Sequence, residues 1–199
     1  MIVIATRNPG KIAEIQQLLA GLANGLTIYS LDDLGLTGDC PESGQTFREN
    51  ACRKAIFYSY QVENRLCLAD DSGLQVQALN DRPGIYSARY AGPDATDEEN
   101  IQKLLLELAG QQNRRARFTA VLALARAGQL IETFTGEVDG LILEEKRGSR
   151  GFGYDPVFYY PPLKKTFAEL SPAEKNRVSH RARAFSLLRD FLLAHETNT

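Results

Sequence analysis

Apolar residues recur along the chain with two spacings, and each spacing predicts a different kind of element. Apolar positions three and four residues apart predict helices over residues 9–22, 47–63, 97–109, 172–178 and 180–195. Continuous or alternating apolar runs predict strands over residues 1–5, 26–31, 65–69, 74–79, 116–125, 130–136 and 138–143. Helices and strands alternate early, and residues 116–136 read as an antiparallel hairpin. The pattern therefore predicts an α/β fold with a mixed β-sheet and flanking helices.

Local signals at the helix starts support these boundaries. Asn8 is a good N-cap before Pro9. Three later helix starts read as capping boxes, which pair Thr46 with Glu49, Thr96 with Glu99, and Ser171 with Glu174.

Two helix starts carry positive charge, although the N-terminus of a helix is itself positive. Lys11 follows Asn8 in "TRNPGK", and Arg181 follows Ser179 in "SHR". Two interpretations stay open: the cations extend into water, or they converge with backbone N–H groups on a bound phosphate. The first stretch is not a Walker motif, because it lacks the second glycine and the hydroxyl that should follow the lysine.

Composition narrows the class of protein. The 199 residues are 43% hydrophobic, which is enough for one domain over 1–199, with two lobes around a cleft. The formal charge of -2 provides no field for nucleic acid, and no apolar run approaches a membrane span or a signal peptide. Cys40, Cys52 and Cys67 suit neither a disulfide framework nor a zinc site, so we expect a cytoplasmic protein.

Adjacent carboxylates form the first chemical candidate. In "LCLADDSGL", Asp70 and Asp71 end an apolar strand, and Ser72 and Gly73 would make a turn. One interpretation is a solvated Asx turn, and the other is a general base or metal site. Glu42 in "GDCPESGQT" is a further candidate acid. Because magnesium takes one or two carboxylates together with waters and phosphate oxygens, these acids would suffice for Mg²⁺.

Aromatic residues form the second candidate. "RGSRGFGYDPVFYY" surrounds Phe152 and Tyr154 with glycines and places Asp155 beside them. These residues could hold a flat base, or they could simply form a turn before an aromatic strand.

Taken in order, several motifs resemble one family. "TRNPGK", "TFRENACRKA", "ADDSGL", "RPGIYSARYAG", "GFGYDP" and "AEKNRVSHR" span nearly the whole chain. This ordered set is similar to the inosine triphosphate pyrophosphatases, also called non-canonical purine nucleoside triphosphate pyrophosphatases. The resemblance implies two lobes around a central nucleotide-binding cleft, a homodimer, and magnesium-dependent hydrolysis of ITP, dITP and XTP to the monophosphate and pyrophosphate.

The resemblance also implies residue roles. Asp71 would be the catalytic base, with Asp71, Glu42 and Asp70 as candidate metal ligands. Lys54 and Arg89 would add phosphate contacts. The remaining substrate contacts would be Thr6, Arg7, Asn8, Pro9, Gly10, Lys11, Ser72, Phe152, Gly153, Tyr154, Asp155, Lys175, His180 and Arg181. The chain departs from the family at Arg7, where many members have glycine, and at Pro41–Glu42, where relatives often have two acids.

Arg181 is the residue that we expect to read the base. A guanidinium only donates hydrogen bonds, so it can pair with a 6-oxo group but not with the amino group of adenine. Two alternatives stay open for the whole chain. A Maf-like pyrophosphatase should lack the "GFGYD" and "SHR" motifs, and a nucleotide-sensing module that binds without turnover would not need the aspartate pair.

Overall fold

The computed structural model describes residues 1–20 and 27–196. These residues form two compact units. Unit 1 comprises the described residues within 1–71, 120–136 and 181–199, and unit 2 comprises residues 72–119 and 137–180. Three long strands, β3 (Leu66–Val76), β5 (Arg115–Arg126) and β6 (Gln129–Ile142), each contribute residues to both units. The chain thus crosses from one unit to the other within continuous strands.

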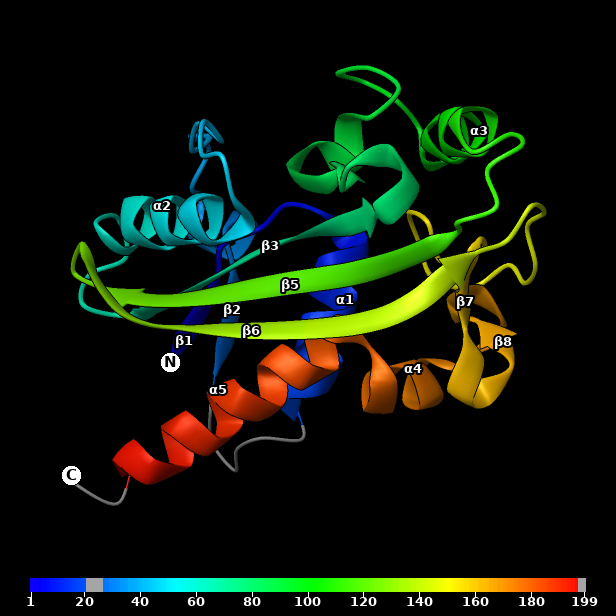
Figure 1. The fold of residues 1–199 in the computed structure, drawn as a ribbon. Helices are drawn as coiled ribbons and strands as arrows, with labels where there is room; N and C mark the ends of the chain where they lie inside the picture. Colours follow the sequence, from blue (N-terminus) through cyan, green and yellow to red (C-terminus); the bar gives the residue numbers. More distant parts are fainter. Residues whose placement is uncertain (21–26, 197–199) are drawn as a thin grey trace. The chain divides into compact units, whose positions relative to one another are not determined.

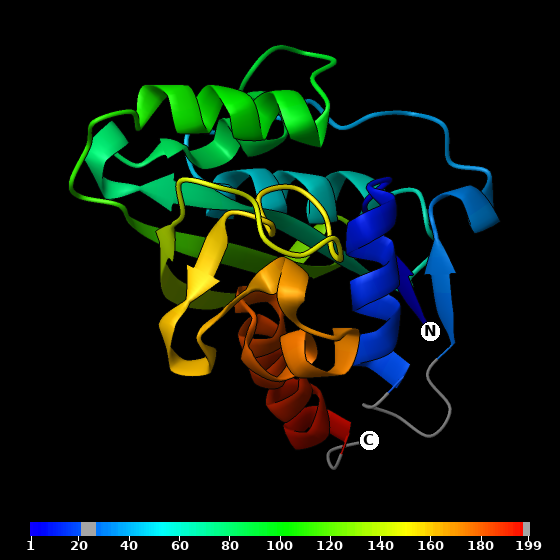
Figure 2. The same cartoon turned by 90° about the vertical axis from the view of Figure 1, so that its right-hand side faces the viewer.

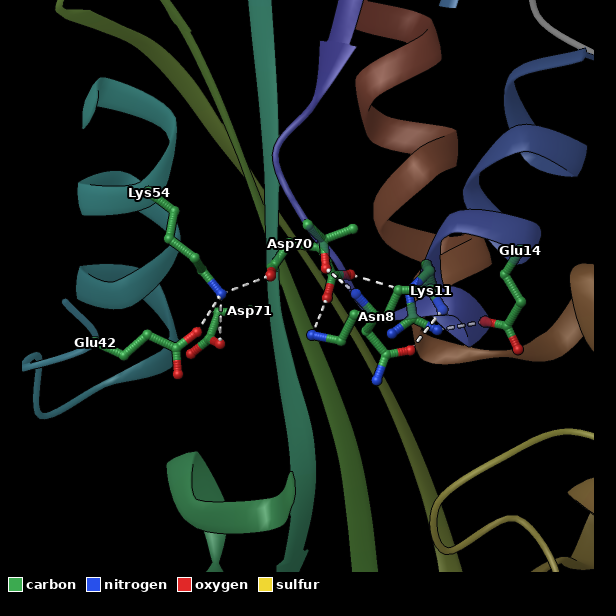
Figure 3. Close-up of polar contacts among 9 residues, drawn as sticks. Asn8, Lys11, Glu14, Glu42, Lys54, Asp70 and Asp71 are labelled. Atoms are coloured by element: carbon green, nitrogen blue, oxygen red, sulfur yellow. Dashed lines mark hydrogen bonds and ion pairs between the residues drawn. The ribbon is translucent and has the colours of Figure 1, made fainter. Parts of the chain in front are cut away.

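Unit 1 is a sheet with helices on both faces (Figure 1). The order of its strands is β2-β1-β3-β5-β6, and β1 pairs in parallel with both β2 and β3. Its elements are β1 (Ile2–Ile4), α1 (Pro9–Ala20), β2 (Ile28–Ser30), α2 (Phe47–Ser59), α5 (His180–Glu196) and parts of β3 (Leu66–Val76), β5 (Arg115–Arg126) and β6 (Gln129–Ile142). Helix α2 lies on one face of the sheet, and α1 and α5 lie on the other (Figures 1 and 3).

The core of unit 1 explains why these segments fold together. Apolar side chains of the strands, such as Ile4 and Leu68, pack with Ile15 and Leu19 of α1 and with Phe185 of α5. The 3.6-residue spacing of α1 places its apolar side chains on the sheet and leaves its N-terminus beside the carboxyl end of β1.

Unit 2 is built around the other parts of the long strands. The order of its strands is β3-β5-β6-β7-β8, and β4 pairs antiparallel with β3. Its own elements are β4 (Arg82–Pro83), a 3-10 helix η3 (Gly84–Arg89), α3 (Asp97–Glu107), β7 (Phe158–Tyr160), β8 (Lys165–Thr166) and α4 (Pro172–Val178). Phe118, Phe158 and Phe167 form its aromatic centre. Helix α3 packs against η3 (Figure 2).

Most predicted elements are confirmed, and the differences have physical causes. The expected turn at Ser72–Gly73 is wrong, because β3 continues from Leu66 to Val76 and pairing within the sheet overrides the local turn residues. For the same reason residues 130–136 and 138–143 form one strand, β6. Residues 77–79 form a 3-10 helix instead of the end of a strand.

The helix ends and caps also differ in detail. Helices α2 and α3 end at Ser59 and Glu107, earlier than expected. The capping boxes at Thr96 and Ser171 are confirmed. The one at Thr46 is incomplete, because its Glu49 carboxylate accepts from Gln45 instead. Residues 21 and 22 of the expected first helix, and Leu26 of the next strand, lie outside the described residues.

Candidate active site

The two adjacent aspartates of β3 point to opposite faces of the sheet. Successive side chains of a strand alternate between its faces, so Asp70 and Asp71 do not share one site. Figure 3 shows Lys11 and Glu14 on one side of the strand, and Lys54 and Glu42 on the other. The repulsion expected for neighbouring carboxylates is thereby avoided, because each aspartate has its own cation.

Asp70 is buried between two cations in unit 1. Its Oδ1 atom lies 2.6 Å from Lys11 Nζ, and its Oδ2 atom accepts a hydrogen bond from Arg181 Nε at 2.9 Å. Arg181 also donates to Glu14 of α1. Burial alone would raise the pKa of Asp70, but the charges of Arg181 and Lys11 lower it well below its ordinary value. Asp70 is therefore an ionised counterion under neutral conditions.

This network accounts for the positive charges at the two helix starts. The interpretation that they extend into water is wrong, because the side chain of Arg181 is 1% exposed and that of Lys11 is 15% exposed. Both bind a fixed internal anion, Asp70. Metal ligation by Asp70 does not fit this geometry, because both of its oxygens are held by cations. Base reading by Arg181 fits equally poorly, because its guanidinium is committed to Asp70 and Glu14.

On the opposite face, Lys54 joins two acids. Its Nζ atom donates to Glu42 Oε1 at 3.0 Å, to Asp71 Oδ1 at 3.0 Å and to the carbonyl oxygen of Asp70 at 2.9 Å. These three bonds use all the donors of an ammonium group, so a phosphate contact from Lys54 would require one of them to break. The main effect of Lys54 in this structure is to hold Glu42 beside Asp71.

Asp71 has an unusual environment for a carboxylate. Burial raises its pKa above the ordinary value, against the opposing charge of Lys54. Its Oδ2 atom is buried, and no described residue forms a hydrogen bond with it. A buried carboxylate oxygen without a donor is costly unless a ligand satisfies it. The atom is thus suited to bind a metal ion or to accept a proton from water.

The acids fit Mg²⁺ in number and in chemistry. Mg²⁺ is commonly bound by one or two carboxylates, with waters and substrate phosphates completing its shell. Glu42 and the Oδ2 atom of Asp71 supply such a pair. Over the described ranges, no group of three His, Cys, Asp or Glu side chains is placed to hold a metal by itself. Most of the shell would therefore come from the substrate and water.

The loop between β1 and α1 has the form of a phosphate-binding turn. Asn8 Oδ1 accepts from the backbone N–H of Lys11 at 2.9 Å, which confirms Asn8 as the N-cap, and Pro9 and Gly10 open the helix. The Thr6 hydroxyl accepts from the backbone N–H of Asn8 at 3.3 Å. Pro9 has no N–H, and the N–H groups of Lys11 and Ile12 both bond to Asn8, so among the described residues of this first turn Gly10 keeps a backbone N–H for an anion.

Arg7 faces a different segment. Its guanidinium donates to Asp39 at 3.1 Å, to the carbonyl oxygen of Leu36 at 2.7 Å and to that of Gly38 at 3.2 Å. A phosphate contact by Arg7 would compete with these bonds. In this structure Arg7 instead holds the segment that leads to Glu42.

In unit 2, Lys175 organises the predicted base-binding residues. Its ammonium forms a buried ion pair with Asp155 and lies 5.0 Å from the ring centroid of Phe152. Asp155 Oδ2 also accepts from the backbone N–H of Phe152 at 3.0 Å. Gly151 has a φ of +75°, and a Cβ there would collide with Asp155. The glycine is thus required for the aromatic residue, the acid and the lysine to meet.

The other predicted residues of unit 2 have different surroundings. Tyr154 is buried and donates to the carbonyl oxygen of Ser87 at 2.9 Å, so its hydroxyl serves the fold. The His180 ring stacks on Phe118 with centroids 4.6 Å apart. The Arg89 guanidinium lies 5.3 Å from the ring centroid of Tyr86. Ser72 is half-buried on β3.

Sequence reasoning missed three residues that shape these groups. Glu14 is one helical turn beyond Lys11 on α1 and binds Arg181. Asn50 accepts from the N–H of Gly44 at 2.8 Å and so fixes the loop that follows Glu42. Asp97 accepts from the N–H of Gly153 at 2.6 Å. Asn50 alone had a detectable signal, as a polar residue on the apolar face of a predicted helix.

The fold and its charged residues define an α/β protein with a candidate site for polyphosphate and a divalent ion in unit 1. In unit 2 they define a candidate site for an aromatic base. The Ham1 family matches residues 2–191, and the chain belongs to this family. In the described part of the chain, no helix is both long and apolar enough to cross a membrane.

Relatives agree with this assignment. The dITP/XTP pyrophosphatase of Desulfotalea psychrophila is 50% identical and is aligned over 94% of this chain and 82% of its own. That of Bacillus subtilis is 46% identical, with 96% of both chains aligned. The structure of the Staphylococcus aureus Ham1 protein matches with a TM-score of 0.86, at 43% identity and 98% coverage of both chains. The family resemblance and the α/β fold class are thus confirmed.

Proposed function

We propose that the chain hydrolyses ITP, dITP and XTP to the monophosphate and pyrophosphate, and so cleanses the nucleotide pool. One observation carries the proposal: Lys54 holds Glu42 beside Asp71, whose buried Oδ2 atom has no hydrogen-bond donor among the described residues. Relatives that are named dITP/XTP pyrophosphatases support it. The family match also favours this activity over the Maf-like and non-catalytic alternatives.

The residues of unit 1 would act on the polyphosphate. The N–H of Gly10 at the start of α1 and the Lys11 ammonium would bind phosphate oxygens. Glu42 and Asp71 would hold Mg²⁺, which when bound would neutralise charge on the phosphates. Asp71 would orient the attacking water and accept its proton, and its raised pKa suits a general base. Lys54 would keep the two acids at a fixed separation.

The residues of unit 2 would bind the base. Phe152 offers an aromatic face, and Lys175 offers a cation beside it. Hypoxanthine and xanthine carry a 6-oxo acceptor, whereas adenine carries a 6-amino donor. An ammonium group only donates hydrogen bonds, so it can bind the 6-oxo group of the first two bases. It cannot bind the 6-amino group of adenine, which is also a donor. Lys175 is also paired with an acid, Asp155, but unlike Arg181 it lies beside the aromatic face of Phe152, so we assign to it the recognition first expected of Arg181.

A substrate panel tests this function. Pyrophosphate release with Mg²⁺ is measured for ITP, XTP and ATP at several concentrations. Sites built to hydrogen-bond their substrate can reject a mismatched analogue by as much as about 10⁴-fold, so kcat/KM for ITP and XTP should greatly exceed that for ATP. Similar values for all three nucleotides would refute the proposed selectivity.

Two further properties belong to the proposal. We expect a homodimer, which light scattering after size-exclusion chromatography would detect. We also expect a cytoplasmic location, which is consistent with the free thiols of Cys40, Cys52 and Cys67.

A further inference from the structure

Helix α3 presents a row of polar side chains to neighbouring loops of unit 2. Asp97, Asn100 and Lys103 are three residues apart, so they lie along one side of the helix. Each forms a hydrogen bond with a backbone group of a neighbouring loop. The helix dipole favours the acidic first turn of this helix, but it does not account for contacts to loops.

Two of these side chains hold the segment that contains Arg89. Asn100 Oδ1 accepts from the N–H of Ala91 at 2.8 Å, and its Nδ2 donates to the carbonyl oxygen of Ala88 at 3.1 Å. Lys103 donates to the carbonyl oxygen of Tyr90 at 2.6 Å. The backbone on both sides of Arg89 is therefore tied to α3.

Asp97 holds the predicted base-binding loop. Its Oδ2 atom accepts from the backbone N–H of Gly153 at 2.6 Å, and the preceding N–H, of Phe152, bonds to Asp155 at 3.0 Å. Two consecutive amides are thus fixed by two carboxylates from different elements. Gly153 has a φ of +58°, which glycine adopts without steric cost, and because glycine is also the most conformationally free residue, the contact to Asp97 restricts this backbone.

Glu98 provides an internal comparison for Asp97. Both are acidic residues in the first turn of α3, so both complement the helix dipole. Glu98 forms an exposed ion pair with Lys146 at 2.6 Å, a side-chain contact. Asp97 alone of the two accepts a backbone amide of the 151–155 loop.

We propose that Asp97 is a positioning residue for base recognition: it fixes the backbone of residues 152–153, and thereby the place of the Phe152 ring beside Lys175. The inference rests on the proposed function and deepens it. It predicts that Asp97 affects binding of ligands that carry the base and has no effect on ligands that consist of phosphate alone.

The test compares Asp97→Ala, Asp97→Asn and Glu98→Ala by calorimetric titration with inosine monophosphate and with pyrophosphate plus Mg²⁺. A hydrogen bond to a charged acceptor is strong, so Asp97→Ala should weaken binding of inosine monophosphate by roughly 10-fold. Asp97→Asn keeps an acceptor and should stay within about 3-fold of the parent chain. Glu98→Ala should match the parent, and pyrophosphate should bind equally to all variants.

Three results would overturn the inference. The first is equal affinity of Asp97→Ala and Glu98→Ala for inosine monophosphate. The second is an equal loss of affinity for inosine monophosphate and for pyrophosphate in Asp97→Ala. The third is no binding of inosine monophosphate to the parent chain. Pyrophosphate release from ITP by the parent chain is measured separately. Its absence refutes the proposed function, whereas equal behaviour of Asp97→Ala and Glu98→Ala refutes only the role of Asp97.

Discussion

Replacing Asp70 by Asn removes the internal anion that neutralises Lys11 and Arg181. The Asp70 side chain is 0% exposed and that of Arg181 is 1% exposed, so solvent cannot take over this role. Removing one partner of a buried ion pair typically costs about 3–5 kcal/mol, because the other charge stays buried and uncompensated. Glu14 still pairs with Arg181, which places the expected loss of unfolding free energy for Asp70→Asn near the lower value, about 3 kcal/mol.

A matched exposed pair provides the control. Arg117 Nε binds Asp139 Oδ1 at 2.7 Å, but the two side chains are 45% and 76% exposed. Pairs of this kind contribute about 0.2–1 kcal/mol, so Asp139→Asn should have little effect. Urea denaturation followed by circular dichroism gives both values. In a chain of this size a loss of about 3 kcal/mol corresponds to a decrease in Tm of roughly 6–12 °C.

The pH dependence of the Asp70→Asn effect has a defined sign. The folded-state pKa of Asp70 lies below its ordinary value, so its stabilising contribution is complete above the unfolded pKa of about 4. The contribution decreases as the pH falls from there toward the folded-state pKa. The difference between the parent chain and Asp70→Asn should therefore be constant near neutral pH and shrink in acid. A loss below about 1 kcal/mol at pH 7, or a loss equal to that of Asp139→Asn, would refute the buried-counterion account.

Three other substitutions test the acid pair and its support. Asp71→Asn should lower kcat by about 10²- to 10⁴-fold with little change in nucleotide affinity, and near-normal turnover would remove Asp71 from the mechanism. In the parent chain, burial raises the pKa of Asp71, so kcat/KM should fall on the acid side at a pH above the ordinary Asp pKa of about 4. Glu42→Gln should shift the Mg²⁺ concentration for half-maximal rate upward by roughly 10-fold or more, and an unchanged midpoint would exclude Glu42 as a ligand. Asn50→Leu should also raise this midpoint and should cost about 1–3 kcal/mol, since the buried N–H of Gly44 loses its acceptor; an effect on stability alone would show that Asn50 does not position Glu42.

Apolar spacing predicted most elements because packing of α1, α2 and α5 on the sheet depends on it. It failed where tertiary pairing overrides local preference. Asp70-Asp71-Ser72-Gly73 has the composition of a turn, yet it lies within β3, which continues through these residues as a strand of the sheet beside β5. Because a turn was expected after Asp71, the sequence did not predict that alternation along β3 would place Asp70 and Asp71 on opposite faces of the sheet.

The partners of the charged residues could not be predicted. The positive residues at the two helix starts could be recognised in the sequence, but their partners could not. Arg181 binds Asp70, which is 111 residues away in the sequence, and Asp97 binds Gly153, which is 56 residues away. No local pattern in the sequence encodes contacts between residues so far apart along the chain, because tertiary packing brings them together. Conversely, Asn8 as an N-cap and Lys175 beside Phe152 were found through local capping chemistry and through the family resemblance.

The most direct test of the proposed function is the identity of the products from ITP and Mg²⁺. Anion-exchange chromatography separates inosine monophosphate, inosine diphosphate, pyrophosphate and orthophosphate, with Asp71→Asn as the inactive control. The account predicts inosine monophosphate and pyrophosphate in equal amounts from the parent chain, and their loss in Asp71→Asn. Inosine diphosphate with orthophosphate, or no hydrolysis of ITP, would contradict it.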